Sequence, residues 1–179
     1  WLYGAGDLRL AAAEAPEARE MLRDAAPLAI LSWNRAGATL GIATRRPGAP
    51  DASFIRMDHT TPLWQLGEGW FQLEANYRWT RERADARLYR PPGARAFQLT
   101  VNVSPDHIRA MKTIGVRLFL NGEPAGARHF SSNGWQTVRW DLAPAADGPV
   151  SVRFESDPFH PSGDPRALGV AVVSFGFVD

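Results

Sequence analysis

The sequence contains no cysteine and a single lysine, Lys112, among its 179 residues. Without cysteine the chain can form no disulfide, thiolate metal site, iron–sulfur cluster or cysteine nucleophile. The charges are balanced, 20 Lys+Arg against 19 Asp+Glu, so the basic excess of a nucleic-acid binder is missing. No apolar run approaches the roughly 20 residues that span a bilayer. We therefore expect no nucleic-acid partner and no membrane span in this sequence.

Common catalytic and cofactor motifs are also missing. There is no phosphate-binding glycine loop, no nucleophile-elbow serine and no His-Glu-x-x-His zinc helix. The histidines at positions 59, 107, 129 and 160 have spacings that fit no metal template. We therefore expect no metal site built from these residues and no catalytic cofactor.

The first 50 residues predict a helix followed by a β-hairpin. The helix is expected within residues 8–25, where Pro16-Glu17 suits a first turn and apolar residues follow at helical spacing. Pro27 ends it. Two strand-like runs, Leu28 to Trp33 and Thr39 to Thr44, are close enough to pair as a hairpin.

A run rich in proline and glycine, residues 45–50, marks a boundary. We expect residues 1–50 to be an extension or connector and residues 51–179 to be the main domain. The sequence begins at Trp1 without a methionine or a signal-peptide pattern, so we expect it to be a piece of a longer protein.

From residue 51 the pattern is typical of short antiparallel strands. Val150, Val152 and Phe154 alternate with polar neighbours, which places one face of the strand in a core and the other in solvent. The predicted strands are 52–57, 69–75, 84–90, 95–103, 114–121, 125–131, 135–142, 149–155 and 168–178, and a helical turn is predicted at 105–112. The fold class is therefore mainly β, an antiparallel β-sandwich of jelly-roll type with a short N-terminal helix and hairpin.

Aromatic residues gather in this β part, and each has two interpretations. An exposed ring can stack on the C–H face of a sugar, whereas a sandwich also needs large rings between its sheets. Trp79 and Trp140 lie in strand-like contexts and are expected in the core. Trp70 and Trp135 each follow a glycine where a loop meets a strand, so the sequence leaves both core and rim open for them.

Two further groups are candidates for a ligand or for structure. Phe159 and His160 lie in a proline-rich loop with Asp164 and Arg166, which could bind a ligand or close one end of the sandwich. Glu74 and Arg78 flank a turn before a tryptophan and suggest a hydrogen-bonded corner or a ligand contact. Glu74 with Asp157 or Asp164 could also supply the two carboxylates of a glycan hydrolase.

A set of short motifs occurs in a fixed order within residues 64–179. They are Gly69-Trp70-Phe71, Glu74, Arg78-Trp79-Thr80, Ala86 to Tyr89, Val116 to Gly122, Trp135, Phe159 with Pro161, and Asp164-Pro165-Arg166-Ala167-Leu168-Gly169. This order resembles the C-terminal β-sandwich of bacterial polytopic membrane glycosyltransferases of the GT-C type. The resemblance implies a jelly roll like a carbohydrate-binding module, outside the cytoplasm, and attached to a parent membrane glycosyltransferase.

Together the residues and the resemblance predict a non-catalytic domain that binds or positions a glycan or a lipid-linked sugar. The candidate binding residues are Trp70, Glu74, Arg78, Trp135, Phe159, His160, Asp164 and Arg166. A structural calcium ion, as in many jelly rolls, stays open, although no Asp-rich loop requires it. The alternatives are a structural or protein-interaction sandwich without a ligand and a small glycan hydrolase.

Overall fold

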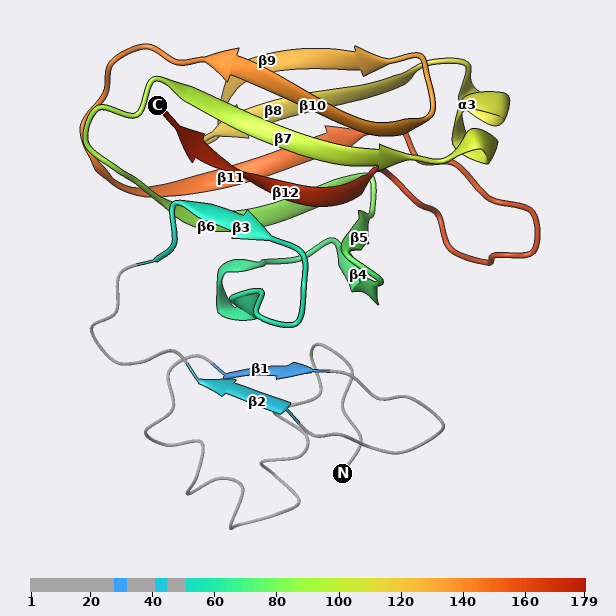
Figure 1. Cartoon of the computed structure of the whole chain (residues 1–179), viewed down its shortest axis with the longest axis horizontal. Helices are drawn as coiled ribbons and strands as arrows, with labels where there is room; N and C mark the ends of the chain where they lie inside the picture. Colours follow the sequence, from blue (N-terminus) through green and yellow to red (C-terminus); the bar gives the residue numbers. More distant parts are fainter. Residues whose placement is uncertain (1–27, 32–40, 45–50) are drawn as a thin grey trace. The chain divides into compact units, whose positions relative to one another are not determined.

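The computed structural model describes residues 28–31, 41–44 and 51–179 (Figure 1). The chain divides into two units, residues 1–50 with 62–64 and residues 51–61 with 65–179, and each is described by itself. In the first unit, β1 (Leu28–Leu31) pairs antiparallel with β2 (Gly41–Thr44), as predicted. The helix predicted within residues 8–25 and the boundary at 45–50 lie outside the described residues.

From residue 51 the chain is almost entirely β. Its elements are β3 (Phe54–Arg56), the 3-10 turn η1 (Leu63–Gln65), β4 (Trp70–Glu74), β5 (Tyr77–Thr80), β6 (Arg83–Arg90), β7 (Ala96–Val103), α3 (Pro105–Met111), β8 (Ile114–Leu120), β9 (Glu123–Phe130), β10 (Gly134–Asp141), β11 (Gly148–Ser156) and β12 (Ala171–Val178). The helix α3 begins as its sequence predicts, because the Ser104 side chain accepts a hydrogen bond from the backbone N–H of His107 and proline occupies the first turn.

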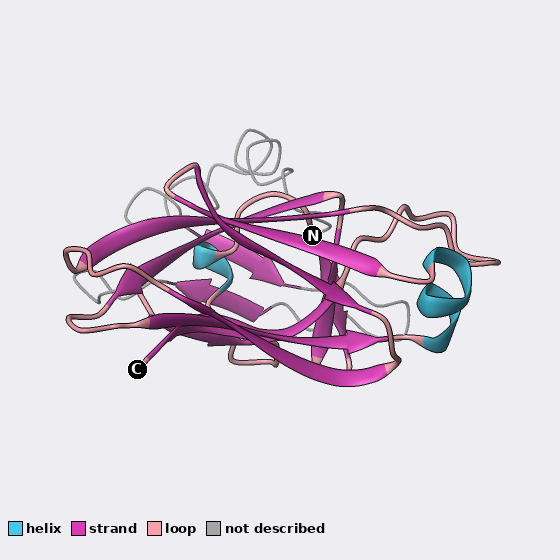
Figure 2. Ribbon diagram, turned by 90° about the horizontal axis from the view of Figure 1, so that it is seen from above, coloured by secondary structure: helices cyan, strands magenta, loops and turns pink. Residues whose placement is uncertain are grey.

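Two antiparallel sheets face each other as a jelly-roll sandwich (Figure 2). The six-stranded sheet has the order β10-β7-β12-β5-β4, with β3 paired to β12, and the four-stranded sheet has the order β6-β11-β8-β9. The predicted fold class is therefore confirmed for the sandwich. No helix among the described residues is long and apolar enough to cross a membrane.

Alternation along the strands builds the core between the sheets. In β11 the inward residues Val152 and Phe154 are 1% exposed, whereas their neighbours Ser151 and Arg153 face solvent. Phe97 lies at the centre of an aromatic cluster, with ring centroids 5.1–6.4 Å apart, whose other members are Trp70, Trp140, Phe154, Phe175 and Phe177. Trp79 and Trp140 are buried, as the sequence predicts.

Strand β5 is not predicted from the sequence. Arg78, Trp79 and Thr80 are all buried, so this strand has no alternating pattern, and its residues predict a hydrogen-bonded corner instead. The predicted turn before it does exist, since Ala75 adopts a positive φ of 54° between β4 and β5. Strand β12 also begins later than predicted, because Leu168 forms an isolated bridge with Phe159 instead.

Gly69 permits a close approach of two backbone segments next to β4. Its φ is +86°, and a Cβ at this position would stand 1.8 Å from the carbonyl oxygen of Arg83. Gly122 has nearly the same φ, +85°, but a Cβ there would meet nothing within 4 Å. A comparison of substitutions at Gly69 and Gly122 therefore separates the cost of steric overlap from the cost of backbone strain.

Gly69→Ala is expected to lower the free energy of unfolding by about 2–3 kcal/mol, because both overlap and strain are introduced. Gly122→Ala should lower it by only about 1 kcal/mol, the cost of strain alone. Urea titration of both variants measures the difference, and equal losses would show that the close approach at Gly69 is absent.

Candidate functional site

The outer face of the four-stranded sheet is covered by ion pairs. Glu155 binds both Arg83 at 3.2 Å and Arg117 at 3.3 Å, and Arg153 binds Asp85 at 2.8 Å. Such exposed pairs contribute little to stability, but they satisfy the charges on this face. The face has the character of a solvated surface rather than of a ligand site.

The outer face of the six-stranded sheet is different, because uncharged polar side chains occupy its middle. The register places Thr100 of β7 between Thr137 of β10 and Ser174 of β12, with Arg56 of β3 beyond Ser174. Thr100 and Thr137 share a hydrogen bond of 2.9 Å between their hydroxyl oxygens. Hydroxyl groups both donate and accept hydrogen bonds, so this row can bind a partner that does the same.

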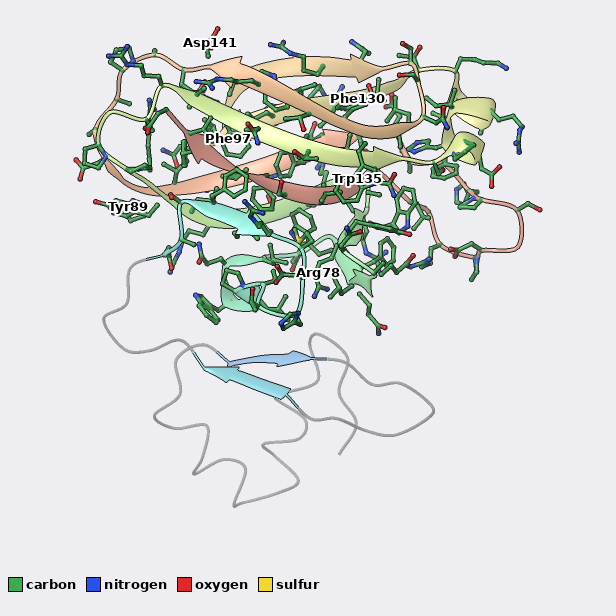
Figure 3. All side chains as sticks on the ribbon, in the orientation of Figure 1. Arg78, Tyr89, Phe97, Phe130, Trp135 and Asp141 are labelled. Atoms are coloured by element: carbon green, nitrogen blue, oxygen red, sulfur yellow. The ribbon has the colours of Figure 1, made fainter. Side chains whose placement is uncertain are left out.

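Trp135 is the large apolar side chain exposed on this face. Its side chain is 58% exposed, and the residue stands opposite Asn102, at the end of the sheet where β7 leads into α3 (Figure 3). Trp135 and the buried Trp140 are five residues apart in β10, so their side chains point to opposite faces. Because Trp140 belongs to the core, Trp135 must face outward.

Trp135 borders a shallow depression of about 350 Å³. The lining residues are Arg56, Met57, Asp58, Asn76, Thr100, Trp135, Val173 and Ser174. Thr100 and Ser174 lie on the neighbouring central strands β7 and β12, and Trp135 lies on the edge strand β10. The edge strand and β3 are three strand spacings apart, about 14 Å, so the depression extends across the strands between an indole and a polar rim.

Of the eight candidate residues from the sequence, only Trp135 lines this depression. Trp70 is half-buried, and its ring stacks on Phe175 with centroids 5.5 Å apart while its indole N–H donates to the carbonyl oxygen of Asp85 at 2.7 Å. Arg78 is buried and donates to the carbonyl oxygen of Phe71 at 3.0 Å. Burial lowers the pKa of Arg78. Both side chains therefore make contacts that hold the fold.

The structure does bring together Glu74, Asp164 and Arg166. The guanidinium of Arg166 donates to Glu74 at 2.7 Å and to Asp164 at 2.7 Å, and it lies 5.2 Å from the ring centre of Phe71. These contacts lower the pKa of the Asp164 carboxyl group and tie residues 157–167 to β4. The cluster therefore has the contacts of a structural ion-pair network that holds this loop against β4.

Phe159 and His160 have different surroundings although they are adjacent. Phe159 is 4% exposed and stacks on His107 with centroids 3.9 Å apart, beside Trp79. Residues 157–167 therefore close one end of the sandwich through Phe159. His160 is exposed and lines a second depression of about 300 Å³ next to α3, where Asp106 and Arg109 already form an ion pair of 2.6 Å.

Burial lowers the pKa of His107 to about 4, from an ordinary value near 6.5. The unfolded chain therefore binds a proton at this residue between pH 6.5 and 4 that the folded protein does not. Stability contributed by neutral His107 is fully present above pH 6.5 and falls as the pH drops. We expect a loss of about 2 kcal/mol by pH 4.5.

His107→Phe keeps the stacking on Phe159 and removes the titration. Urea titrations at pH 7 and pH 4.5 should give a smaller loss of unfolding free energy for this variant than for the wild type. The exposed histidines are the same in both proteins, so they cancel in the comparison. An unchanged loss would show that His107 titrates normally in the folded protein.

Among residues 51–179 and the two described N-terminal strands, no group of three or more His, Asp or Glu side chains could hold a metal ion. The carboxylates predicted as a hydrolase pair, Glu74 and Asp164, are joined by Arg166. A lowered pKa makes Asp164 unsuited to act as a general acid near neutral pH.

The polar residues around Trp135 could not be predicted from the sequence. Arg56, Asp58 and Asn76 come from segments far from β10, and Thr100 and Ser174 are inconspicuous in strands. The spacing of Trp135 and Trp140 was the one sequence pattern that indicates an exposed Trp135, because residues an odd number apart in a strand face opposite sides of the sheet. The other residues meet only through strand pairing, which the sequence does not reveal.

The described residues from 51 onward form a jelly-roll β-sandwich with an exposed tryptophan and polar side chains on one outer face. A scan against protein-family models finds no match, and a search of curated proteins finds none either. The chain is similar to the CBM36-1 domain of a multidomain xylanase from the hindgut metagenome of Trinervitermes trinervoides, with 10% identity, a TM-score of 0.44, and 70% of this chain and 97% of that chain covered.

Two further solved structures are similar. A family 35 carbohydrate binding module from an environmental isolate has 14% identity and a TM-score of 0.40, with 73% of this chain and 85% of that chain covered. The acetyl xylan esterase Est2A of the rumen bacterium Butyrivibrio proteoclasticus has 11% identity and a TM-score of 0.47, with 69% of this chain and 31% of the esterase covered. These likenesses concern the fold alone.

Proposed function

We propose that residues 51–179 form a non-catalytic glycan-binding domain whose binding surface is the outer face of the six-stranded sheet. The main support for this proposal is the exposed Trp135 beside a depression whose lining includes three uncharged polar side chains, Asn76, Thr100 and Ser174. An indole offers a flat apolar surface to the C–H face of a sugar ring. Thr100, Ser174 and Asn76 are placed to exchange hydrogen bonds with hydroxyl groups.

The contrast between the two outer faces supports this choice. On the four-stranded sheet, arginine and carboxylate side chains already satisfy one another, so a sugar would have to compete with existing pairs. On the six-stranded sheet, no ion pair between described residues crosses the depression. A neutral, hydroxyl-rich ligand therefore loses less on desolvation there.

The shallow depression also indicates the strength of binding. It is at the lower end of the volumes that enclose small ligands, and one aromatic ring borders it. We expect dissociation constants in about the 10 μM to 1 mM range for one domain, about −7 to −4 kcal/mol. Weak single-site binding is useful where several domains act together on one polymer.

On the sequence resemblance alone, we also propose that the domain serves a larger bacterial glycosyltransferase at the extracytoplasmic side of the cell envelope. There it would bind or position a glycan or a lipid-linked sugar. The comparisons do not support a glycosyltransferase parent, so this part stays a prediction. Localisation of the whole parent protein and of its transferase activity in cell fractions tests it.

The binding proposal is tested by a glycan-array and polysaccharide screen of the whole 179-residue chain. The expected result is binding to a glycan that Trp135→Ala abolishes and Phe119→Ala preserves. Phe119 is a matched control, because it is an aromatic residue on the outer face of β8 in the other sheet. Absence of glycan binding by a folded chain would overturn the proposal and favour a protein-interaction domain, since tryptophan is also common at protein interfaces.

A further inference from the structure

The depression beside Trp135 contains a pair of opposite charges, Arg56 and Asp58. They are the charged residues among its lining side chains, so the described lining has no net charge. Arg56 is the last residue of β3, and Asp58 follows it in the turn after the strand. Both line the depression, whereas Met57 between them is 1% exposed. The rim opposite Trp135 thus offers a donor and an acceptor together.

Asp58 is held in a fixed turn. Its Oδ1 accepts hydrogen bonds from the backbone N–H of Thr60 at 2.7 Å and from the Thr60 hydroxyl at 2.6 Å. The backbone N–H of Asp58 donates to the Thr61 hydroxyl at 2.9 Å. The hydrogen bonds from Thr60 lower the pKa of Asp58, so the group is a carboxylate at neutral pH. Within the described residues, its Oδ2 accepts no hydrogen bond and can receive one from a ligand.

Arg56 is exposed, and the carboxylate of Asp58 is close enough to interact with it electrostatically. A guanidinium alone would attract an anionic sugar such as a uronate. With Asp58 beside it, an incoming carboxylate meets an attraction and a repulsion of similar size. A hydroxyl group has no such conflict, since it can donate to Asp58 and accept from Arg56.

We propose that this face selects neutral glycan chains over chains that contain uronates or other anions, with Asp58 as the residue that determines the selection. This inference rests on the proposed glycan-binding function of the same face. Trp135 supplies stacking on one side, and the Arg56–Asp58 pair reads hydroxyl groups on the other side, about 14 Å away across the strands. A chain of more than one sugar is needed to reach both.

The test is affinity electrophoresis of the whole chain in gels that contain defined polysaccharides. Neutral xylan, galactan and mixed-linkage β-glucan are compared with polygalacturonate and alginate. The proteins are the wild type, Trp135→Ala, Asp58→Asn and Arg56→Gln. Asp58→Asn keeps the shape and the Thr60 contacts of the side chain but removes the charge, and circular dichroism confirms that each variant is folded.

The wild type should be retarded by at least one neutral polysaccharide and should bind polygalacturonate and alginate at least tenfold more weakly. Asp58→Asn should strengthen binding to the acidic chains by at least about fivefold, because Arg56 then acts without an opposing charge. Arg56→Gln should not produce this gain. Retention by the neutral chain should change less than about twofold when salt is raised, since no net charge is involved.

The two proposals fail in different ways. If no polysaccharide retards the wild type, or if Trp135→Ala binds as well as the wild type, the glycan-binding face itself is wrong, and the selectivity falls with it. If Trp135→Ala abolishes retention but the acidic chains bind the wild type as tightly as the neutral chains, the face binds glycans and Asp58 does not select among them. An Asp58→Asn variant with unchanged preference also overturns the selectivity.

Discussion

Trp135→Ala is expected to weaken glycan binding at least about 30-fold while changing the free energy of unfolding by less than about 0.5 kcal/mol. The binding loss is large because the indole is the exposed aromatic surface at the depression. The stability change is small because 58% of the side chain is already in solvent. Isothermal titration calorimetry with the retained polysaccharide, alongside urea titration, measures both quantities.

Phe119→Ala provides the comparison for this variant. It removes an aromatic ring from the outer face of the other sheet, where arginine–carboxylate pairs surround it. Its affinity for the glycan should equal that of the wild type. Equal weakening of binding in both variants would contradict the assignment of the site to the six-stranded sheet.

Phe97→Ala is expected to have the largest effect on stability, a loss of about 3–5 kcal/mol in the free energy of unfolding. Phe97 is fully buried in β7, and its ring contacts those of Phe154, Phe175 and Phe177 with centroids 5.4–6.3 Å apart. Those rings come from both sheets, so alanine would leave a cavity between the two sheets. Urea titration with tryptophan fluorescence measures the loss.

The half-buried Phe119 again serves as the control, because it contributes no ring to this cluster. Phe119→Ala should cost clearly less, about 1 kcal/mol. A loss below about 1 kcal/mol for Phe97→Ala would mean that the cluster does not hold the two sheets together as described.

The sandwich could be predicted from the sequence because its strands obey a simple period. Inward residues of β8 and β11, such as Val116 and Phe154, alternate with solvated arginines, and turns rich in glycine and proline separate the strands. The prediction failed at β5, where both faces are covered and alternation disappears. Local periodicity therefore predicts strands with one exposed face better than strands that are fully buried.

The candidate site was harder to predict, because residues in the same local sequence context can be buried in one strand and exposed in another. Trp70 and Trp135 both follow a glycine at a strand start, yet Trp70 packs on Phe175 and Trp135 faces solvent. In β4 the pairing shifts between Trp70 and Leu73, so parity could not place Trp70. In β10 the strand pairing is regular, so the odd spacing between Trp135 and the buried Trp140 indicates that Trp135 faces outward, as it does in the structure.

In the loop from 157 to 167, charged residues are engaged with one another. Asp164, Arg166 and Glu74 together are typical of a polar site, but their mutual hydrogen bonds leave them engaged with one another. Asn76, Thr100 and Ser174, which no sequence pattern singles out, line the depression beside Trp135. Binding surfaces for sugars need hydrogen-bonding capacity that the protein does not use up itself, and a hydroxyl such as that of Thr100 can both donate and accept, so it keeps capacity beside its bond to Thr137.

Amide chemical-shift mapping by NMR can locate the glycan on the surface of the sandwich. The whole labelled chain is titrated with a neutral oligosaccharide cut from the polysaccharide that retards it. We expect the shifted amides to cluster in β7, β10 and β12, together with Arg56 to Asp58 and the indole N–H of Trp135. Shifts confined to the depression beside α3 or to the ion-paired face of the four-stranded sheet would contradict it.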